Sequence, residues 1–393
     1  MWMHPGIIGS FGTVPGVSNF TRENNSSIIA GLASTKNGSA DTLVAALGDS
    51  VTAGKGGGTG DGWGGARPFA YPRKLAAALN AVTIPSIQAD FWGEGTSSGS
   101  VSAIDNYMVN ISRSGTGFAL SSSVSSVGGF CHAQNNIVDS TSTITYTCPP
   151  GVVANNVKIF VARNPGIGDY VVSIDGGAES SAVPTAGTAG AFTTAFSLGS
   201  AATGHTVRIR KSNTTAAGVY ILGVYFYNTA SPSIQIWNWG RGAWKTDDWV
   251  LTTAAWTQGN QYHTQGQHLT IINCIINDFV ARPTSSTTTI TNLNTMVTAL
   301  QSAGSTVWLV LPQYVTPSIG TSVTQQDAYR SAVASLATTK NCPLVDLTYY
   351  YPSWTAWSTS GLDFDGVHPN GSGYQHFVDS FYRPMFQALY AAV

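Results

Sequence analysis

One strand-and-turn segment constrains the fold of this 393-residue chain more than any other. The run Leu43–Leu47 is short and apolar, as expected of a buried strand, and it leads directly into Gly48, Asp49 and Ser50. A serine at the carboxyl end of such a strand lies where open α/β sheets place their reactive groups. The segment therefore predicts an α/β fold with a candidate nucleophile at Ser50.

A second segment, near the C-terminus, offers the partners that a serine nucleophile needs. Asp365 and His368 lie three residues apart, and Pro369 follows. A serine hydroxyl is a weak nucleophile that requires a base within hydrogen-bond reach and a third group to orient that base. We therefore expect His368 to be the base and either Asp365 or Asp363 to be the orienting carboxylate.

These two segments, in this order, resemble the outer motifs of the SGNH (GDSL-type) hydrolases. Asn277 and Asp278 follow the apolar run 269–276 and are similar to the family's GxND block, although Ile275 stands where the family has glycine. The resemblance implies that the Asn277 side-chain amide contributes to an oxyanion hole. It also favours Asp365 over Asp363, because the family's carboxylate and histidine are spaced as DxxH.

The segment 238–244 is similar to the remaining NxGxxG block of the family. Its last glycine position falls on Ala243, or on Gly242 after a shift of one residue. The contribution expected there is a backbone N–H, which both residues have, so either amide can complete an oxyanion hole with the Ser50 N–H. The resemblance covers roughly residues 40–85 and 232–393, and it implies a parallel sheet flanked by helices and ester hydrolysis without metal or cofactor.

The region between these two parts has a different sequence pattern. Alternating polar and apolar runs, separated by Gly, Asn, Pro and Ser, indicate short antiparallel strands at 143–147, 157–161, 170–174, 205–210 and 219–227. We therefore expect residues 86–231 to form an inserted β-sandwich, which loosely resembles the jelly-roll modules of some carbohydrate esterases. The hydrolase domain would then comprise residues 41–85 and 232–393, preceded by an irregular arm over residues 1–40.

The composition limits the classes of partner. Charged residues make up only 9% of the chain, against about 25% in an average soluble domain, and the net charge is −1. This balance gives no electrostatic case for binding nucleic acid or an anionic membrane. Few charges and many Ser, Thr, Asn and Gly residues are typical of extracellular or virion-surface β-rich proteins. An extracellular location is therefore expected, although Met1–Pro5 lacks the basic and apolar regions of a signal peptide.

The cysteines and the apolar runs exclude several further features. No apolar run reaches about 18 residues, so no membrane-spanning helix is expected. Cys131 and Cys148 flank a β-like stretch and either form a local disulfide or remain free thiols. Cys274 and Cys342 read as small buried hydrophobes, and no spacing resembles a zinc site. The glycine-rich stretch 55–65 is a weak nucleotide motif, since no acidic ribose-binding partner follows it.

Aromatic and basic side chains near the predicted loops are candidate substrate-binding residues. Trp63, Trp239, Arg241 and Trp244 lie in or beside these loops, where they either stack on a sugar ring or pack locally. The resemblance, the insert and the composition together lead us to expect a serine esterase that removes O-acetyl groups from a polysaccharide. The alternatives are a general short-chain esterase or lipase, or a phage or cell-surface glycan-binding protein with a weakened hydrolase domain. An oligomer is compatible with the sequence.

Overall fold

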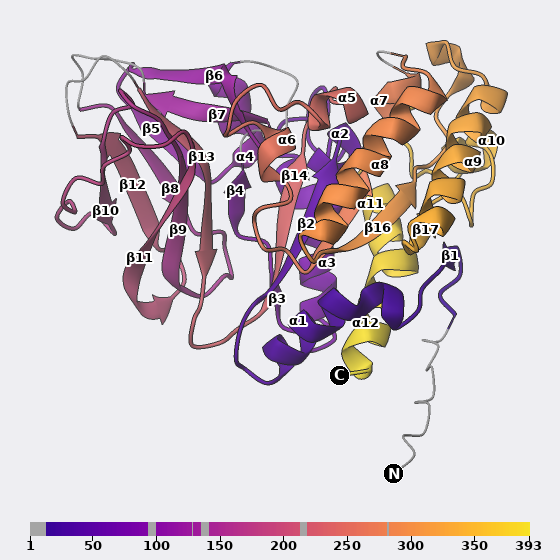
Figure 1. Ribbon diagram of the computed structural model, residues 1–393, viewed down its shortest axis with the longest axis horizontal. Helices are drawn as coiled ribbons and strands as arrows, with labels where there is room; N and C mark the ends of the chain where they lie inside the picture. Colours follow the sequence, from indigo (N-terminus) through magenta and orange to yellow (C-terminus); the bar gives the residue numbers. More distant parts are fainter. Residues whose placement is uncertain (1–12, 93–99, 128, 135–140, 213–217, 281–282) are drawn as a thin grey trace.

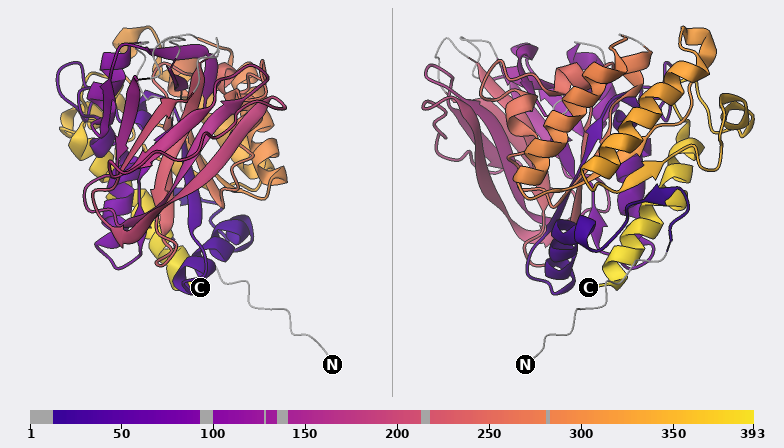
Figure 2. Two further views of the ribbon diagram at one scale, coloured as in Figure 1. Left: turned by 90° about the vertical axis from the view of Figure 1, so that its left-hand side faces the viewer. Right: turned by 45° about the vertical axis from the view of Figure 1, so that its right-hand side comes forward.

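The computed structural model describes residues 13–92, 100–127, 129–134, 141–212, 218–280 and 283–393. Two parts stand side by side: an α/β domain, and a body of antiparallel strands that lies at the left of Figure 1 and of the right-hand view in Figure 2. The α/β fold class with an inserted antiparallel β-sandwich is confirmed.

The α/β domain is built on one seven-stranded sheet. Its neighbours run in the order β1 (Val17–Ser18), β17 (Leu344–Asp346), β16 (Thr306–Leu311), β15 (Leu269–Asn273), β2 (Thr42–Gly48), β14 (Ile234–Gly240) and β3 (Ser86–Ile87). All neighbouring strands are parallel except β1, which pairs antiparallel with β17. The central strand β2 is flanked by β14 on one side and β15 on the other. Because this arrangement reverses the strand order at β2, it creates the crevice in which open α/β sheets place ligands.

Helices cover both faces of this sheet, as expected for a parallel sheet with buried strands. One face carries α8 (Ser286–Ser302) and α9 (Val323–Thr339), which pack on each other and on β16 (Figure 1). The other face carries α1 (Ser26–Lys36), α3 (Tyr71–Asn80), α11 (Gly371–Phe377) and α12 (Arg383–Ala391). A π-helical turn, Val378–Tyr382, joins α11 to α12, so the helical segment after His368 is interrupted once. Short helices at the loops are α2 (Ser50–Ala53), α5 (Thr246–Trp249), α6 (Gln258–Gln261), α7 (Ile276–Phe279) and α10 (Trp354–Thr359), with 3-10 turns at Glu23–Asn25, Arg67–Phe69 and Pro317–Ile319.

The described part of the predicted N-terminal arm is not irregular. Residues 17–18 form the edge strand β1, and α1 packs on β2 and α12. Gly31 of α1 lies so close to the His268 side chain that a Cβ there would come within 2.8 Å of the ring. The expectation of an irregular arm over residues 1–40 is therefore wrong for residues 17–18 and 23–36, where tertiary packing orders the chain. Residues 1–12 lie outside the described residues.

The insert consists of two antiparallel sheets. One has the order β10 (Tyr170–Ile174), β12 (Thr206–Lys211), β8 (Thr143–Thr147) and β5 (Ile111–Ser114). The other has the order β11 (Gly190–Ala202), β9 (Ala154–Arg163), β13 (Val219–Tyr227), β7 (Gly129–Gln134) and β6 (Phe118–Ser126), and β4 (Asp90–Trp92) also pairs with β13. One helix of the insert, α4, spans Val101–Met108. Because β3 belongs to the hydrolase sheet, the insert begins after Ile87 rather than at residue 86.

An aromatic cluster joins the two parts. Trp92, at the end of β4, lies 4.5 Å from Phe160 of the insert and 5.7 Å from both Trp237 and Trp239 of β14, measured between ring centroids. Tyr225 of β13 approaches Trp237 at 5.3 Å. These side chains belong to the same buried cluster as the α/β core, so the insert is packed firmly against the edge of the hydrolase sheet.

Of the two alternatives for Cys131 and Cys148, a local disulfide or free thiols, the structure shows the free thiol at Cys148. Cys148 is a buried free thiol whose Sγ lies 3.6 Å from the Val152 carbonyl oxygen, and burial raises the pKa of this thiol to about 12. Cys274 and Cys342 are also buried free thiols, as expected. No helix among the described residues is both long and apolar enough to cross a membrane.

Candidate active site

The carboxyl ends of three adjacent strands bring distant sequence blocks together. Gly48 at the end of β2 stands beside Gly240 of β14 and beside Asn273 of β15 in the strand register. Gly240 lies so close to α2 that a Cβ there would come within 2.1 Å of the Ala53 nitrogen. A side chain at position 240 would therefore push β14 away from the helix that begins with Ser50.

Asp49 fixes the turn that presents Ser50. It is the N-cap residue of α2, and its Oδ1 accepts a hydrogen bond of 2.9 Å from the Val51 N–H. The Asp49 N–H donates to the Asn273 carbonyl, which ties the turn to β15. Complete burial raises the pKa of Asp49 to about 7, because removal from water disfavours the charged carboxylate. The aspartate of the turn thus holds the backbone from inside the protein.

The three residues predicted from the sequence as nucleophile, base and orienting carboxylate form one hydrogen-bonded chain. The Ser50 Oγ lies 2.7 Å from the His368 Nε2. The His368 Nδ1 lies 2.9 Å from both carboxylate oxygens of Asp365. Ser50 and His368 are 5% and 6% exposed, whereas the Asp365 side chain is one-third exposed. This geometry allows His368 to take a proton from Ser50 while its other nitrogen donates to Asp365.

The alternative carboxylate, Asp363, has a different contact. Its oxygens accept hydrogen bonds from the Gly366 N–H at 3.0 and 3.2 Å, within the turn that leads to His368. The same turn is held by the Thr316 N–H, which donates to the Gly366 carbonyl, and by the Gln313 amide, which donates to the Val367 carbonyl. Asp363 therefore shapes the loop, and Asp365 is the residue that contacts the imidazole.

Burial and charge act in opposite directions on the two titrating partners. Burial lowers the pKa of His368 below its usual 6.5; Asp365 opposes this effect, and the positive charge of Lys55 adds to it. Burial alone would raise the pKa of Asp365, but hydrogen bonds and charge from His368 outweigh burial and hold it well below its usual range. The lowered pKa of His368 favours the neutral imidazole, which is the form that can accept a proton.

The candidate oxyanion donors follow the carboxyl ends of the adjacent strands β2, β14 and β15. The Ser50 N–H opens α2, and among the described residues it has no acceptor. Gly242 is buried, and its N–H likewise has no acceptor within the part of the chain that the structure describes. Ala243 is exposed and adopts a left-handed backbone conformation with φ +62°. Between the two alternatives from the sequence, the geometry favours the Gly242 amide.

Asn277 is held close to the same loop. It is 6% exposed, and its Nδ2 donates a hydrogen bond of 2.8 Å to the Trp244 carbonyl, which leaves the second N–H of the amide for another acceptor. Ile275, which stands in place of the family's glycine, is buried with φ −95°, so no left-handed conformation is needed there. The departure at Ile275 is therefore accommodated without backbone strain.

Asp278 is a buried structural partner rather than a solvated turn residue. Its carboxylate accepts hydrogen bonds from the Thr246 N–H, the Thr246 hydroxyl and the Thr289 hydroxyl. These bonds connect α7 to the start of α5 and to α8, and they keep the Trp244 loop near Asn277.

The four candidate substrate-binding residues differ in how much of each side chain is exposed. Trp239 is completely buried between Trp92 and Trp237, so the prediction that it stacks on substrate is wrong: both faces of β14 are covered. Trp63 is 9% exposed and packs edge-on against Tyr107 at 5.7 Å. Arg241 is also nearly buried, with its guanidinium 5.8 Å from the centre of the Trp244 ring. Trp244 is half-buried and remains the most accessible of the four.

Sequence reasoning missed the role of the glycine-rich loop that follows α2. Its first residue, Lys55, places its Nζ 3.9 Å from the Asp365 Oδ2, and its carbonyl accepts a 2.6 Å hydrogen bond from the buried Tyr374 hydroxyl. Gly56, with φ +93°, lies so close to the His368 loop that a Cβ would come within 2.4 Å of the Pro369 carbonyl. The glycine run was a signal for this close approach, but nothing in the sequence indicated its partner. No group of three or more potential metal-ligating side chains occurs within the described ranges.

Comparisons with known proteins give a family match and a fold match. Residues 223–376 match the GDSL-like Lipase/Acylhydrolase family, a range that includes Asp365 and His368 and begins after Ser50. A solved peptidoglycan O-acetylesterase is similar over 93% of this chain and 96% of its own, with 14% identity and a TM-score of 0.69. A lipase/acylhydrolase from Enterococcus faecalis (20% identity, TM-score 0.32) covers 38% of this chain and 75% of its own, and an acetyl xylan esterase (19%, 0.33) covers 39% and 82%. No curated protein matches the sequence.

The family match covers residues 223–376, whereas the match to the O-acetylesterase covers 93% of the chain. The match to the O-acetylesterase extends over the hydrolase domain and the insert together, and it shows that the arrangement of both parts is shared. The resemblance inferred from the sequence motifs is confirmed by the family match.

Proposed function

Because this chain is a carboxylic ester hydrolase with a GDSL-type hydrolase domain, we propose that it removes O-acetyl groups from a polysaccharide through Ser50, His368 and Asp365. The observation that carries the proposal is the hydrogen-bonded chain from the Ser50 Oγ through the imidazole to Asp365, with distances of 2.7 and 2.9 Å. A serine, a base and an orienting carboxylate in this geometry are the parts required for acyl transfer.

In the first half-reaction, His368 Nε2 takes the hydroxyl proton as Ser50 Oγ attacks the ester carbonyl carbon. The carbonyl oxygen becomes an oxyanion, which the Ser50 N–H, the Gly242 N–H and the Asn277 amide can stabilise. Collapse of this intermediate breaks the bond to the sugar oxygen, and the His368 imidazolium protonates that oxygen. Ser50 then carries the acetyl group, and the sugar leaves with a free hydroxyl.

In the second half-reaction, water replaces the sugar. Neutral His368 takes a proton from a water molecule, whose oxygen attacks the acetyl carbonyl carbon. The same donors stabilise the second oxyanion, and its collapse returns the proton from His368 to Ser50 Oγ and releases acetate. Throughout both steps Asp365 keeps the Nδ1 proton in place and stabilises the imidazolium.

The polysaccharide is the finer part of the proposal and has its own support. The fold is similar over nearly its whole length to a peptidoglycan O-acetylesterase. The composition, with 9% charged residues, is typical of proteins that work outside the cell, where acetylated polysaccharides occur. An extracellular location belongs to the same proposal.

The test is hydrolysis of p-nitrophenyl acetate by the wild type and by Ser50→Ala, together with acetate release from a panel of acetylated polysaccharides. We expect both activities in the wild type and neither in Ser50→Ala. Hydrolysis of the aryl ester without acetate release from any polysaccharide would indicate a general short-chain esterase. A folded wild type with neither activity would leave the glycan-binding alternative.

A further inference from the structure

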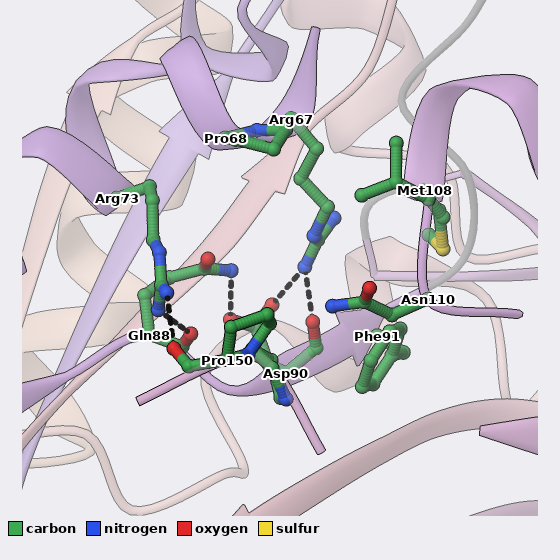
Figure 3. A pocket seen from close by; sticks show the side chains of 11 residues that line it. Arg67, Pro68, Arg73, Gln88, Asp90, Phe91, Met108, Asn110 and Pro150 are labelled. Atoms are coloured by element: carbon green, nitrogen blue, oxygen red, sulfur yellow. Dashed lines mark hydrogen bonds and ion pairs between the residues drawn. The ribbon is translucent and has the colours of Figure 1, made fainter. Parts of the chain in front are cut away.

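An open cavity of about 220 Å³ lies where the hydrolase domain meets the insert (Figure 3). Neither Ser50 nor its two partners line it. One wall comes from the 3-10 turn and from α3 of the hydrolase domain, and the opposite wall comes from the insert. We call it the junction cavity. Its volume is about that of a single sugar unit rather than of a drug-sized molecule.

A buried ion pair forms one side of the junction cavity. The Arg67 Nη2 lies 2.7 Å from the Asp90 Oδ2, with the two side chains 6% and 0% exposed. The same carboxylate also accepts hydrogen bonds from the Gln88 amide, at 2.6 Å, and from the Asn238 N–H, at 3.1 Å. Asp90 is therefore fully occupied by the protein, and its charge is neutralised by Arg67.

Several hydrogen-bond donors at the junction cavity are unused. Among the described residues only Nη2 of the Arg67 guanidinium has acceptors, which leaves the N–H groups of Nε and Nη1 unpaired although the side chain is more than nine-tenths buried. The side-chain amide of Asn110 also makes no hydrogen bond within the described part of the chain, and it points toward Arg67 in Figure 3. Because these donors line the cavity and have no acceptor within the described residues, the arrangement fits a ligand rich in acceptor oxygens.

The charge of the junction cavity is positive. Arg73 donates to the carbonyl oxygens of Gln88 and Pro150, and it has no carboxylate partner among the residues that the structure describes. Two guanidinium groups therefore face the single, already paired carboxylate of Asp90. Arginine is suited to bind carboxylates, since its planar N–H groups match the two oxygens of that group. The excess charge thus favours an anionic ligand.

The remaining lining residues are mostly apolar, and one of them has a strained backbone conformation. Phe91 and Met108 are buried in the wall, whereas Val109 is 48% exposed at the rim. Val109 has φ +54°, a left-handed conformation that β-branched residues rarely adopt. Such strain tends to collect at ligand sites. An apolar wall beside charged donors matches a sugar ring, which has carbon-rich faces and a polar edge.

We propose that the junction cavity binds one carboxylate-bearing sugar unit of the polysaccharide. This inference rests on the proposed function, and it makes the cavity a second subsite beside the reacting one. The residue after Pro68, which lines the cavity, is Phe69; it is 45% exposed and lies against Gly57 and Gly371, next to the His368 loop. The turn Arg67–Phe69 therefore borders the cavity at one end and lies beside that loop at the other. A chain anchored in the cavity can therefore present an ester of a neighbouring unit to Ser50.

The binding test uses the full chain carrying Ser50→Ala, so that no ester is consumed. Calorimetric titration compares three matched pairs of saccharides: oligogalacturonate with oligogalactose, oligoglucuronate with cello-oligosaccharide, and N-acetylglucosaminyl-N-acetylmuramic acid with chitobiose. We expect the acidic member of at least one pair to bind tenfold or more tightly than the neutral member, and to weaken as salt is raised. Equal affinity within all three pairs would overturn the proposal.

Variants locate the site. Arg73→Gln and Asn110→Ala should each weaken binding of the preferred acid, the former by tenfold or more because a charged hydrogen bond is lost. Lys74→Gln is the matched control, since Lys74 is the next residue of α3 and does not line the cavity. Asn110→Ala removes no side-chain hydrogen bond within the described structure, so it remains informative if Arg73→Gln proves unstable. Thermal unfolding verifies that Asn110→Ala and Arg73→Gln are folded. Unchanged binding by these two folded variants would contradict the assignment.

A second readout separates this inference from the proposed function. With Ser50 intact, Arg73→Gln and Asn110→Ala should hydrolyse p-nitrophenyl acetate like the wild type, because this small ester does not reach the junction cavity. They should lose acetate release from the acidic polysaccharide through a higher KM. If the wild type binds the acidic sugar but cleaves no ester, the proposed function fails and the assignment of the cavity stands.

Discussion

Lys55 Nζ lies 3.9 Å from Asp365 Oδ2, so a lysine from the loop after α2 contacts the carboxylate that orients His368. The two residues are 310 positions apart in the sequence. The lysine is kept in place by its backbone: its N–H donates to the Ser50 carbonyl, and its carbonyl accepts from the Tyr374 hydroxyl. The side chains of Lys55 and Asp365 are 27% and 33% exposed, so water and salt weaken the interaction without abolishing it.

This contact predicts a shift in the pH dependence of hydrolysis. His368 acts as a base only when neutral, and its pKa lies below 6.5, so kcat/KM should reach half of its plateau below pH 6.5. Lys55 lowers the pKa of His368, and its removal should therefore raise that pKa. In Lys55→Met the acidic limb should therefore move to higher pH, by a small amount because the charge pair is partly exposed.

The measurement is the pH–rate profile of p-nitrophenyl acetate hydrolysis at low salt and in about 1 M salt, where screening shortens the range of the interaction. Lys74→Met serves as the control, because Lys74 lies over the Phe69 ring and makes no contact with the three residues. Superimposable profiles for wild type and Lys55→Met at low salt would refute the electrostatic role of Lys55.

Asn277→Ala should lower kcat for ester hydrolysis by about 100- to 1000-fold while KM changes little, since an oxyanion donor acts mainly in the transition state. The matched control is Asn292→Ala. The Asn292 amide donates to the Thr246 hydroxyl and the Asp247 carboxylate in the same region, and within the described residues these two hydrogen bonds are structural. Steady-state kinetics of both variants check the prediction. A similar loss in the two variants would mean that Asn277 supports the loop rather than the reaction.

Local patterns in the sequence were sufficient to predict the central strand, the Ser50 turn and most strands of the insert. The run 43–47 is continuous and apolar because β2 is buried between β14 and β15, and the run 219–227 is bounded by turn residues. Burial of the neighbouring strand β14 explains the error at Trp239. A tryptophan that fills a two-sided core has the same sequence context as one that faces a cleft.

Features set by long-range packing could not be predicted in this way. Helix α1 includes Ser, Gly and Thr residues as well as its buried Ile28 and Leu32, and it is ordered by β2 and α12 rather than by its own propensity. The pairing of Arg67 with Asp90 and the approach of Lys55 to Asp365 depend on how segments meet in space. Neither contact leaves a periodic signal in the sequence.

Asp49 should make the stability of the protein depend on pH. Its pKa is about 7 in the folded protein, against 3.8 ordinarily, so between these values the folded state binds more protons than the unfolded state. Its contribution is therefore fully present below about pH 4 and is lost as pH rises to 7. Asp49→Asn keeps an acceptor for the Val51 N–H and carries no charge. It should remove a decline on the order of 3–4 kcal/mol across this range.

Urea unfolding of the wild type and Asp49→Asn at several pH values between 4.5 and 8 measures this effect. Asp61→Asn is the control, since Asp61 is exposed and its Oδ1 likewise accepts from a backbone N–H two residues on. The free energy of unfolding of Asp49→Asn relative to the wild type should increase with pH. A constant difference would show that the carboxylate is already charged throughout this range.

Trp92→Ala should destabilise both parts of the protein at once. Trp92 is 2% exposed and contacts Phe160 of the insert as well as Trp237 and Trp239 of the hydrolase sheet, so its removal opens a cavity in the shared cluster. Loss of a buried tryptophan typically costs about 3–5 kcal/mol. Since the two cores meet at this residue, the wild type should unfold in one calorimetric transition. Trp92→Ala should unfold at a lower temperature and in two transitions.

Tyr349→Ala is the control. Its side chain is 55% exposed, so this variant should change stability by less than about 0.5 kcal/mol. Two well-separated transitions already in the wild type would mean that the aromatic junction does not couple the insert to the hydrolase domain.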